Sequence, residues 1–218
     1  MVVKSNEQPE QAEDSAQSGY GIKPPRNSTK ALVTKIMRNG RAVIVKDFSR
    51  CSAAIRMLYG RPTLRREARA YALLQGIAGI PECFGLEGKD RLVIEYIPGR
   101  LLGSFKRGSV GSEVFDRVDE IVTRAHARGV AFVDLHTSNI IITGSGEVFL
   151  IDFALAAFAR DIRRPGLLVR LFKELDCHAS NRMRARYLRL PEPVPEGLFG
   201  FLYRFGRGLK ATRRKKKH

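Results

Sequence analysis

The first strongly patterned region of the chain starts near residue 31 and predicts a β-hairpin. Residues 31–37 and 41–48 are rich in β-branched and other apolar side chains, and Asn39-Gly40 between them is a strong hairpin turn signal. Residues 1–29 contain few large apolar groups and many polar ones. That segment cannot offset its ordering entropy by burial, so we expect a mobile tail.

A helix and a further strand follow the hairpin in the pattern. Residues 64–74 predict a helix whose apolar face holds Leu64, Ala68, Tyr71 and Leu74. Residues 90–97 predict a strand that Pro98-Gly99 ends. Residues 30–97 therefore predict a small, sheet-rich lobe.

The second half of the pattern predicts a helix and then another hairpin. Residues 113–129 place their apolar side chains on one helical face: Val114, Val118, Ile121, Val122 and Ala125. Residues 138–153 predict a hairpin that turns at residues 144–146. We therefore expect an α+β protein of two lobes, with a short helical lobe over residues 98–190.

Charge adds a candidate partner to this picture. The net charge is +17, and residues 155–218 hold 17 basic and 5 acidic side chains, a net +12. Such an excess indicates an anionic partner, although a solvated surface is the alternative. No run of about 18 apolar residues is present, which excludes a spanning helix. The start of the chain is acidic and has no apolar stretch, so we expect no secretory signal there. The three widely spaced cysteines favour a reducing compartment.

The end of the chain, residues 191–218, forms a basic amphipathic pattern. Five apolar residues follow helical spacing, namely Leu198, Phe201, Leu202, Phe205 and Leu209. Four basic residues fall on the opposite side, namely Arg204, Arg207, Lys210 and Arg214. This pattern suits the interface of an anionic membrane. A last helix packed on the domain, with a solvated tail, is an equal alternative.

Several ionisable residues stand in apolar surroundings. Lys46 lies inside a predicted strand, where a buried ammonium needs an anion, and Glu67 on the next helix is the candidate, with Glu87 and Glu95 as competitors. Asp134 follows an apolar stretch, and Asp152 ends the last predicted strand. A buried carboxylate requires a partner such as a metal ion.

These residues together resemble the protein-kinase-like fold. Asp134 and Asn139 keep the D-x-x-x-x-N spacing of a kinase catalytic loop, and Asp152-Phe153-Ala154 stands where kinases have D-F-G. The resemblance implies that Asp134 accepts the proton of the attacking hydroxyl. It also implies that Asn139 and Asp152 bind Mg²⁺, and that Lys46, oriented by Glu67, holds the phosphates of ATP. Glu95 and Ile97 resemble the hinge that binds adenine through backbone groups.

The chain departs from ordinary protein kinases at several positions. Phe132-Val133 precede the proposed base in place of His-Arg, and Ala154 replaces the glycine of D-F-G. No glycine-rich loop precedes Lys46, where Asn27-Ser28-Thr29 stand instead, and no A-P-E motif follows Asp152. With these departures the chain resembles the compact bacterial lipopolysaccharide core kinases, which phosphorylate Kdo or heptose sugars. It also resembles their relatives, the RIO kinases.

Three functions follow from this resemblance. The first is an ATP- and Mg²⁺-dependent kinase that phosphorylates a lipopolysaccharide core sugar, peripheral to the cytoplasmic face of the inner membrane, with an anionic glycolipid or membrane surface as its partner. The second is a RIO-like serine/threonine protein kinase. The third is a non-catalytic pseudokinase that binds an anionic surface or nucleic acid, the less favoured partner. His136, between the base and the metal ligand, either orients the loop or takes part in catalysis.

Overall fold

The computed structural model describes residues 30–194 together with residues 197 and 200. The predicted mobile tail (residues 1–29, including Asn27-Ser28-Thr29) and most of the predicted amphipathic tail (residues 191–218) lie outside this part, so those expectations stay predictions. The described chain runs through the following elements: β1 (Leu32–Arg38), β2 (Arg41–Asp47), α1 (Ala53–Ile55), the π-helix η2 (Arg56–Gly60), α2 (Arg61–Leu74), β3 (Cys83–Glu87), β4 (Arg91–Glu95), β5 (Arg100–Leu101), the 3₁₀ helix η3 (Leu102–Ser104), α3 (Ser112–Ala127), β6 (Val130–Ala131), the 3₁₀ helix η4 (Thr137–Asn139), β7 (Ile140–Ile142), β8 (Val148–Leu150), β9 (Ala157–Phe158) and α4 (Leu167–Leu188).

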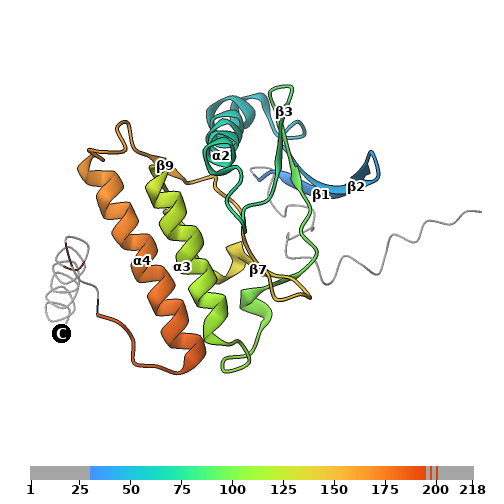
Figure 1. The fold of residues 1–218 in the computed structure, drawn as a ribbon. Coiled ribbons are helices and arrows are strands. Elements are labelled where there is room, and N and C mark those ends of the chain that lie inside the picture. The colour runs from blue at the N-terminus through green and yellow to red at the C-terminus, as the bar shows by residue number, and fades with distance from the viewer. Residues whose placement is uncertain (1–29, 195–196, 198–199, 201–218) are drawn as a thin grey trace, which may run out of the picture.

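A four-stranded antiparallel sheet with strand order β1-β2-β4-β3 forms the first lobe, and α2 lies beside it (Figure 1). The predicted hairpin turn is present, and both Asn39 and Gly40 adopt positive φ angles of 49° and 76°. Asparagine and glycine tolerate this left-handed conformation better than other residues, which explains the turn signal. Strand β3 had no expectation from the sequence, because its side chains alternate between intermediate and exposed positions.

The second lobe is built on two long helices that lie side by side, α3 and α4 (Figure 1). All five residues of the predicted stripe on α3 are buried. Helix α4 had no expectation from the sequence, and its 22 residues add a second long helix to the predicted helical lobe. Its apolar positions follow helical spacing poorly, because an aspartate and a serine, Asp176 and Ser180, are among its buried residues.

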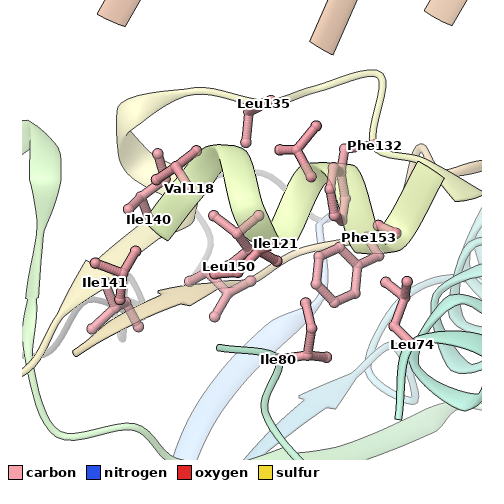
Figure 2. Packing of buried hydrophobic residues seen from close by; sticks show 14 of the residues in the cluster. Leu74, Ile80, Val118, Ile121, Phe132, Leu135, Ile140, Ile141, Leu150 and Phe153 are labelled. Carbon is pink, nitrogen blue, oxygen red and sulfur yellow. The ribbon is translucent and has the colours of Figure 1, made fainter. Parts of the chain in front are cut away.

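One continuous core joins the two lobes. Figure 2 shows Val118 and Ile121 of α3 next to Ile140 and Leu150 of the β7–β8 hairpin. This hairpin is the one predicted over residues 138–153, and it carries candidate residues of the site at both of its outer ends. The position of the site is therefore fixed by a buried hairpin that packs on a buried helix.

Gly79 connects the segment after α2 to this hairpin. Its carbonyl accepts a hydrogen bond from the backbone N–H of Leu150 at 2.8 Å, and its φ angle is +90°. A Cβ at this position would lie 2.6 Å from the carbonyl oxygen of Val148. Only glycine fits such a close backbone approach without strain.

None of the helices in residues 30–194 combines the length and the apolar content needed to cross a lipid bilayer.

Candidate active site

Lys46 makes two ion pairs, one within the first lobe and one to the second lobe. Its Nζ lies 2.6 Å from Oε1 of Glu67 and 3.1 Å from Oδ1 of Asp152. The Glu67 side chain is only 1% exposed, on the face of α2 that packs against the sheet. The predicted pairing of Lys46 with Glu67 is therefore confirmed. Glu87, one of the competitors, pairs with Arg38 instead.

Burial and neighbouring charges shift the pKa values of Lys46 and Glu67. Burial by itself would lower the pKa of Lys46, but the carboxylates of Glu67 and Asp152 outweigh it and raise the pKa above its usual value. Burial raises the pKa of Glu67, an effect that Lys46 opposes and Asp152 strengthens. Lys46 is consequently a fixed positive charge at neutral pH, of the kind that binds phosphate oxygens.

The loop around Asp134 is held by short-range hydrogen bonds. The amide nitrogen of Asn139 donates to the backbone oxygen of Asp134 at 3.0 Å. Because the nitrogen is used in this way, the amide oxygen of Asn139 is the atom that can serve as a metal ligand. The Asp134 side chain is 50% exposed, as a group that must reach a substrate has to be.

His136 lies between these two residues. Its Nδ1 accepts a hydrogen bond from the backbone N–H of Ser138 at 3.2 Å, and its Nε2 lies 3.3 Å from Nδ2 of Asn139. The same Nε2 lies 3.4 Å from Oδ2 of Asp134. These contacts favour the interpretation in which His136 orients the loop.

Asp152 and Phe153 point in different directions from a strained backbone. Asp152 has a φ angle of 67°, which aspartate tolerates better than most residues. Phe153 is 1% exposed, and its ring packs at centroid distances of 4.7 Å from Tyr71 and 5.4 Å from Phe132. Figure 2 shows Phe153 between Phe132 and the end of α2. The buried ring anchors the segment and leaves the Asp152 carboxylate directed to the outside of the core.

A cavity of about 520 Å³ brings the candidate residues together. Its polar lining includes Lys46, Glu67, Asp134, Asn139 and Asp152. This size falls in the range of small-molecule and nucleotide sites. The structure thus brings these five side chains to one cavity, and their roles in catalysis and in binding stay predictions.

The apolar wall of the same cavity includes Val33 and Ile94. Glu95 and Ile97, the predicted hinge residues, come one and three residues after Ile94 but are not among the residues that line the cavity. The Glu95 carboxylate accepts a hydrogen bond from the backbone N–H of Glu82 at 3.0 Å, and Ile97 is 3% exposed. Their proposed role in adenine binding uses backbone atoms only and stays a prediction.

The donor set fits a magnesium ion that is bound together with a phosphate. Among residues 30–194, no three His, Cys, Asp or Glu side chains form a cluster that could hold a metal by themselves. Asn139 and Asp152 supply one amide oxygen and one carboxylate to the cavity. Mg²⁺ typically takes one or two protein oxygens and completes its shell with substrate phosphates and water. The pair is therefore suited to an ion that arrives with a nucleotide.

Asp176 of α4 is the residue that sequence reasoning missed. Its side chain is fully buried and accepts hydrogen bonds from the backbone N–H groups of Phe132 at 2.7 Å and Val133 at 2.8 Å. Nε2 of His126 lies 2.9 Å from the same carboxylate. No spacing rule connects Asp176 to a loop more than 40 residues away, and the polar neighbours of Asp176 in the sequence gave no signal.

Comparisons with known proteins agree with this fold. No protein-family model matches the chain. A Rio2 kinase–ADP/Mg²⁺–phosphoaspartate complex from Chaetomium thermophilum superposes with a TM-score of 0.60 at 13% identity, covering 86% of this chain and 60% of that one. The chain has a protein-kinase-like fold.

Two curated relatives of the kinase-like chain carry kinase names. CBL-interacting protein kinase 16 from Oryza sativa subsp. japonica is 30% identical over 140 residues, which cover 61% of this chain and 30% of the relative. The putative serine/threonine-protein kinase YrzF from Bacillus subtilis is 32% identical over 94 residues, which cover 42% and 43% of the two chains. The chain thus spans less than half the length of either relative. The narrower resemblance to Kdo and heptose kinases has no counterpart in these relatives.

Proposed function

We propose that the protein is an ATP- and Mg²⁺-dependent phosphotransferase that acts on a hydroxyl acceptor. The observation that carries this proposal is the convergence of Lys46, Asp134, Asn139 and Asp152 on one cavity. Phosphoryl transfer needs little covalent chemistry from a protein and depends on positioning and charge neutralisation. A fixed ammonium, two metal-binding oxygens and an exposed carboxylate supply those needs.

Each residue has a distinct task in this proposal. Lys46 binds phosphate oxygens of ATP, and Glu67 holds the Lys46 ammonium in place. Asn139 and Asp152 would hold Mg²⁺, which neutralises charge on the phosphates when it is bound. Asp134 accepts the proton of the attacking hydroxyl, and its exposed carboxylate leaves room for an acceptor to approach.

The acceptor that we favour is a lipopolysaccharide core sugar, Kdo or heptose. The support is the sequence resemblance to that branch and the strongly basic stretch over residues 155–218, which suits an anionic glycolipid at the cytoplasmic face of a membrane. A RIO-like serine/threonine protein kinase is the second candidate, and protein kinases among the curated relatives favour it.

The test is transfer of the terminal phosphate from labelled ATP to lipopolysaccharide core isolated from cells that lack this protein, with a generic protein substrate in parallel. Asp134→Asn should reduce turnover about 10²- to 10⁴-fold and leave nucleotide binding intact, because it removes the base alone. Asp116→Asn is the control, since Asp116 is an exposed carboxylate on α3.

The outcomes separate the candidate functions. Label on glycolipid that disappears in Asp134→Asn supports the sugar kinase. Label found on protein alone favours the RIO-like alternative. Failure of ATP with Mg²⁺ to stabilise the protein against heat would contradict catalysis altogether and favour a non-catalytic binding module.

A further inference from the structure

A second hollow lies beside the catalytic loop and has a different chemistry from the nucleotide cavity. Its volume is about 1270 Å³, and its lining combines residues 135–137 of the loop with the C-terminal half of α4 and the segment that follows it. Four arginines line it, namely Arg107, Arg182, Arg186 and Arg189. We call this hollow the arginine groove.

The lining of the arginine groove carries an excess of positive charge. Glu192 is the one acidic residue that the described part of the chain contributes to its lining. Arg182 and Arg186 are exposed and four residues apart, so they project from the same side of α4. Within the described residues neither side chain forms an ion pair. Arg184 on the same helix, by contrast, pairs with two aspartates of α3.

The groove is next to the proposed base. Asp134 lines the nucleotide cavity, whereas the next three residues, Leu135, His136 and Thr137, line the arginine groove. Nε2 of His136 lies 3.4 Å from Oδ2 of Asp134. One short loop therefore forms a wall of both hollows, with the base at the boundary between them.

We propose that the arginine groove binds a phosphate group already present on a carbohydrate acceptor and thereby places an acceptor hydroxyl at Asp134. This inference rests on the function proposed above and specifies its acceptor. The acceptor oxygen forms a bond to the γ-phosphorus of ATP while the bond from that phosphorus to the ADP oxygen breaks. The hydroxyl proton passes to Asp134, so the products are ADP and an acceptor with one more phosphate.

Arginine chemistry favours phosphate as the group that is recognised. The guanidinium fork matches phosphate oxygens in a bidentate geometry. Arg182 and Arg186 form no ion pair within the described residues, so a phosphate can bind them without first breaking one. Single-stranded nucleic acid is less well matched, because proteins that bind it supply aromatic platforms for the bases. No Phe, Tyr or Trp is among the described residues that line the groove.

The test compares two double variants that each remove two positive charges. Arg182→Gln/Arg186→Gln changes the arginine groove, and Arg65→Gln/Arg66→Gln changes two exposed arginines on α2 in the other lobe. The probes are hexose 6-phosphates, the same hexoses without phosphate, and a single-stranded RNA homopolymer. Binding is measured by saturation-transfer NMR and by calorimetry on the full chain, in the presence of a non-hydrolysable ATP analogue and Mg²⁺.

We expect the protein to bind the hexose phosphates and not the free hexoses. The groove variant should weaken this binding at least about tenfold, and the α2 variant should leave it unchanged. Equal losses in both variants would show non-specific electrostatics and overturn the proposal. RNA binding that depends on Arg182 and Arg186, without binding of hexose phosphate, would overturn it as well. Stabilisation by the ATP analogue is measured in the same samples, and its absence would contradict the proposed function itself.

Discussion

The buried carboxylate of Asp176 accepts a hydrogen bond from the backbone N–H of Val133 at 2.8 Å, immediately before the proposed base. Val133 has a φ angle of 69°, a conformation that β-branched residues rarely adopt. Such strain persists only where the surroundings impose it. Asp176 is the group that imposes it, so the position of Asp134 depends on a residue of α4.

Asp176→Asn should therefore destabilise the protein and impair turnover. The amide offers one acceptor oxygen where the carboxylate offers two, and it points an N–H group towards a backbone donor. Leaving a buried donor without an acceptor costs about 1–3 kcal/mol, so we expect a loss of about 2–4 kcal/mol in the free energy of unfolding, measured by urea denaturation.

A second measurement tests the positioning role of Asp176. In the folded variant, kcat should fall more than the KM for ATP rises, because the base is displaced and the nucleotide site is not. Asp119→Asn is the matched control on the neighbouring helix, where Asp119 contacts Ser180 and Arg184. An Asp176→Asn protein with native stability and native kcat would contradict this account.

The second prediction concerns the pair of Lys46 and Glu67. Lys46→Met leaves the Glu67 carboxylate buried without its counter-charge, and breaking a buried pair in this way costs about 3–5 kcal/mol. The stabilisation by ATP should also disappear, because the phosphate-binding ammonium is gone. Thermal denaturation with and without ATP and Mg²⁺ measures both effects.

Lys46→Met/Glu67→Leu provides the control for this prediction. The double variant removes both charges, so it should recover much of the stability that Lys46→Met loses while it still fails to respond to ATP. If Lys46→Met alone keeps the full response to ATP, the assignment of Lys46 to the phosphates is wrong.

The sequence predicted the first lobe and the site better than the second lobe, for a physical reason. The β1–β2 hairpin has β-rich strands joined by a recognisable turn, and α3 has its apolar residues at helical spacing. Short windows of sequence are therefore enough to predict both elements. Helix α4 interleaves buried polar residues with apolar ones, because Asp176 and Ser180 bond to the catalytic loop and to α3. These partners lie far away along the chain, and no local pattern contains them.

The candidate site was predictable where its residues have a fixed spacing. Asp134 and Asn139 lie on one loop, and Asp152 ends the hairpin that follows, so their convergence follows from local connections. The arginine groove was not predictable in this way. Arg107 precedes α3 while Arg182 and Arg186 lie on α4, and only the packing of α4 beside α3 brings them to one hollow.

The third prediction is a pH dependence that comes from Asp47, the neighbour of Lys46 on β2. Burial by itself would raise the pKa of Asp47, but hydrogen bonds from Ser49 and Arg91 outweigh burial and lower the pKa below its usual value of 3.8. A carboxyl whose pKa is lowered by folding adds stability above its unfolded pKa and loses it as the pH falls through the folded value.

Comparing the stability of the wild type with that of Asp47→Asn at different pH values tests the direction of this pH dependence. The wild type should be more stable by about 1 kcal/mol at neutral pH, and the difference should shrink once the pH falls below 3.8. Chemical denaturation over this range measures it. A difference that grows towards acid pH would reverse the sign and contradict the hydrogen-bonding account.

The last prediction separates the metal ligand from the base. Asp152→Asn should abolish the part of the stabilisation by ADP that depends on Mg²⁺, because an amide is a weaker ligand for a hard cation than a carboxylate. At a ligand concentration of about 100 Kd, the wild type should gain about 2.7 kcal/mol, and chelation of Mg²⁺ should remove the metal-dependent share. Asp134→Asn should keep this share in full, since its role is in proton transfer.

Chelator alone should leave the nucleotide-free protein unchanged, because no cluster of three His, Cys, Asp or Glu residues is present in the described chain. Asp152→Asn with an intact response to Mg²⁺ would show that the ion is held elsewhere, and the shared cavity would then have a different function.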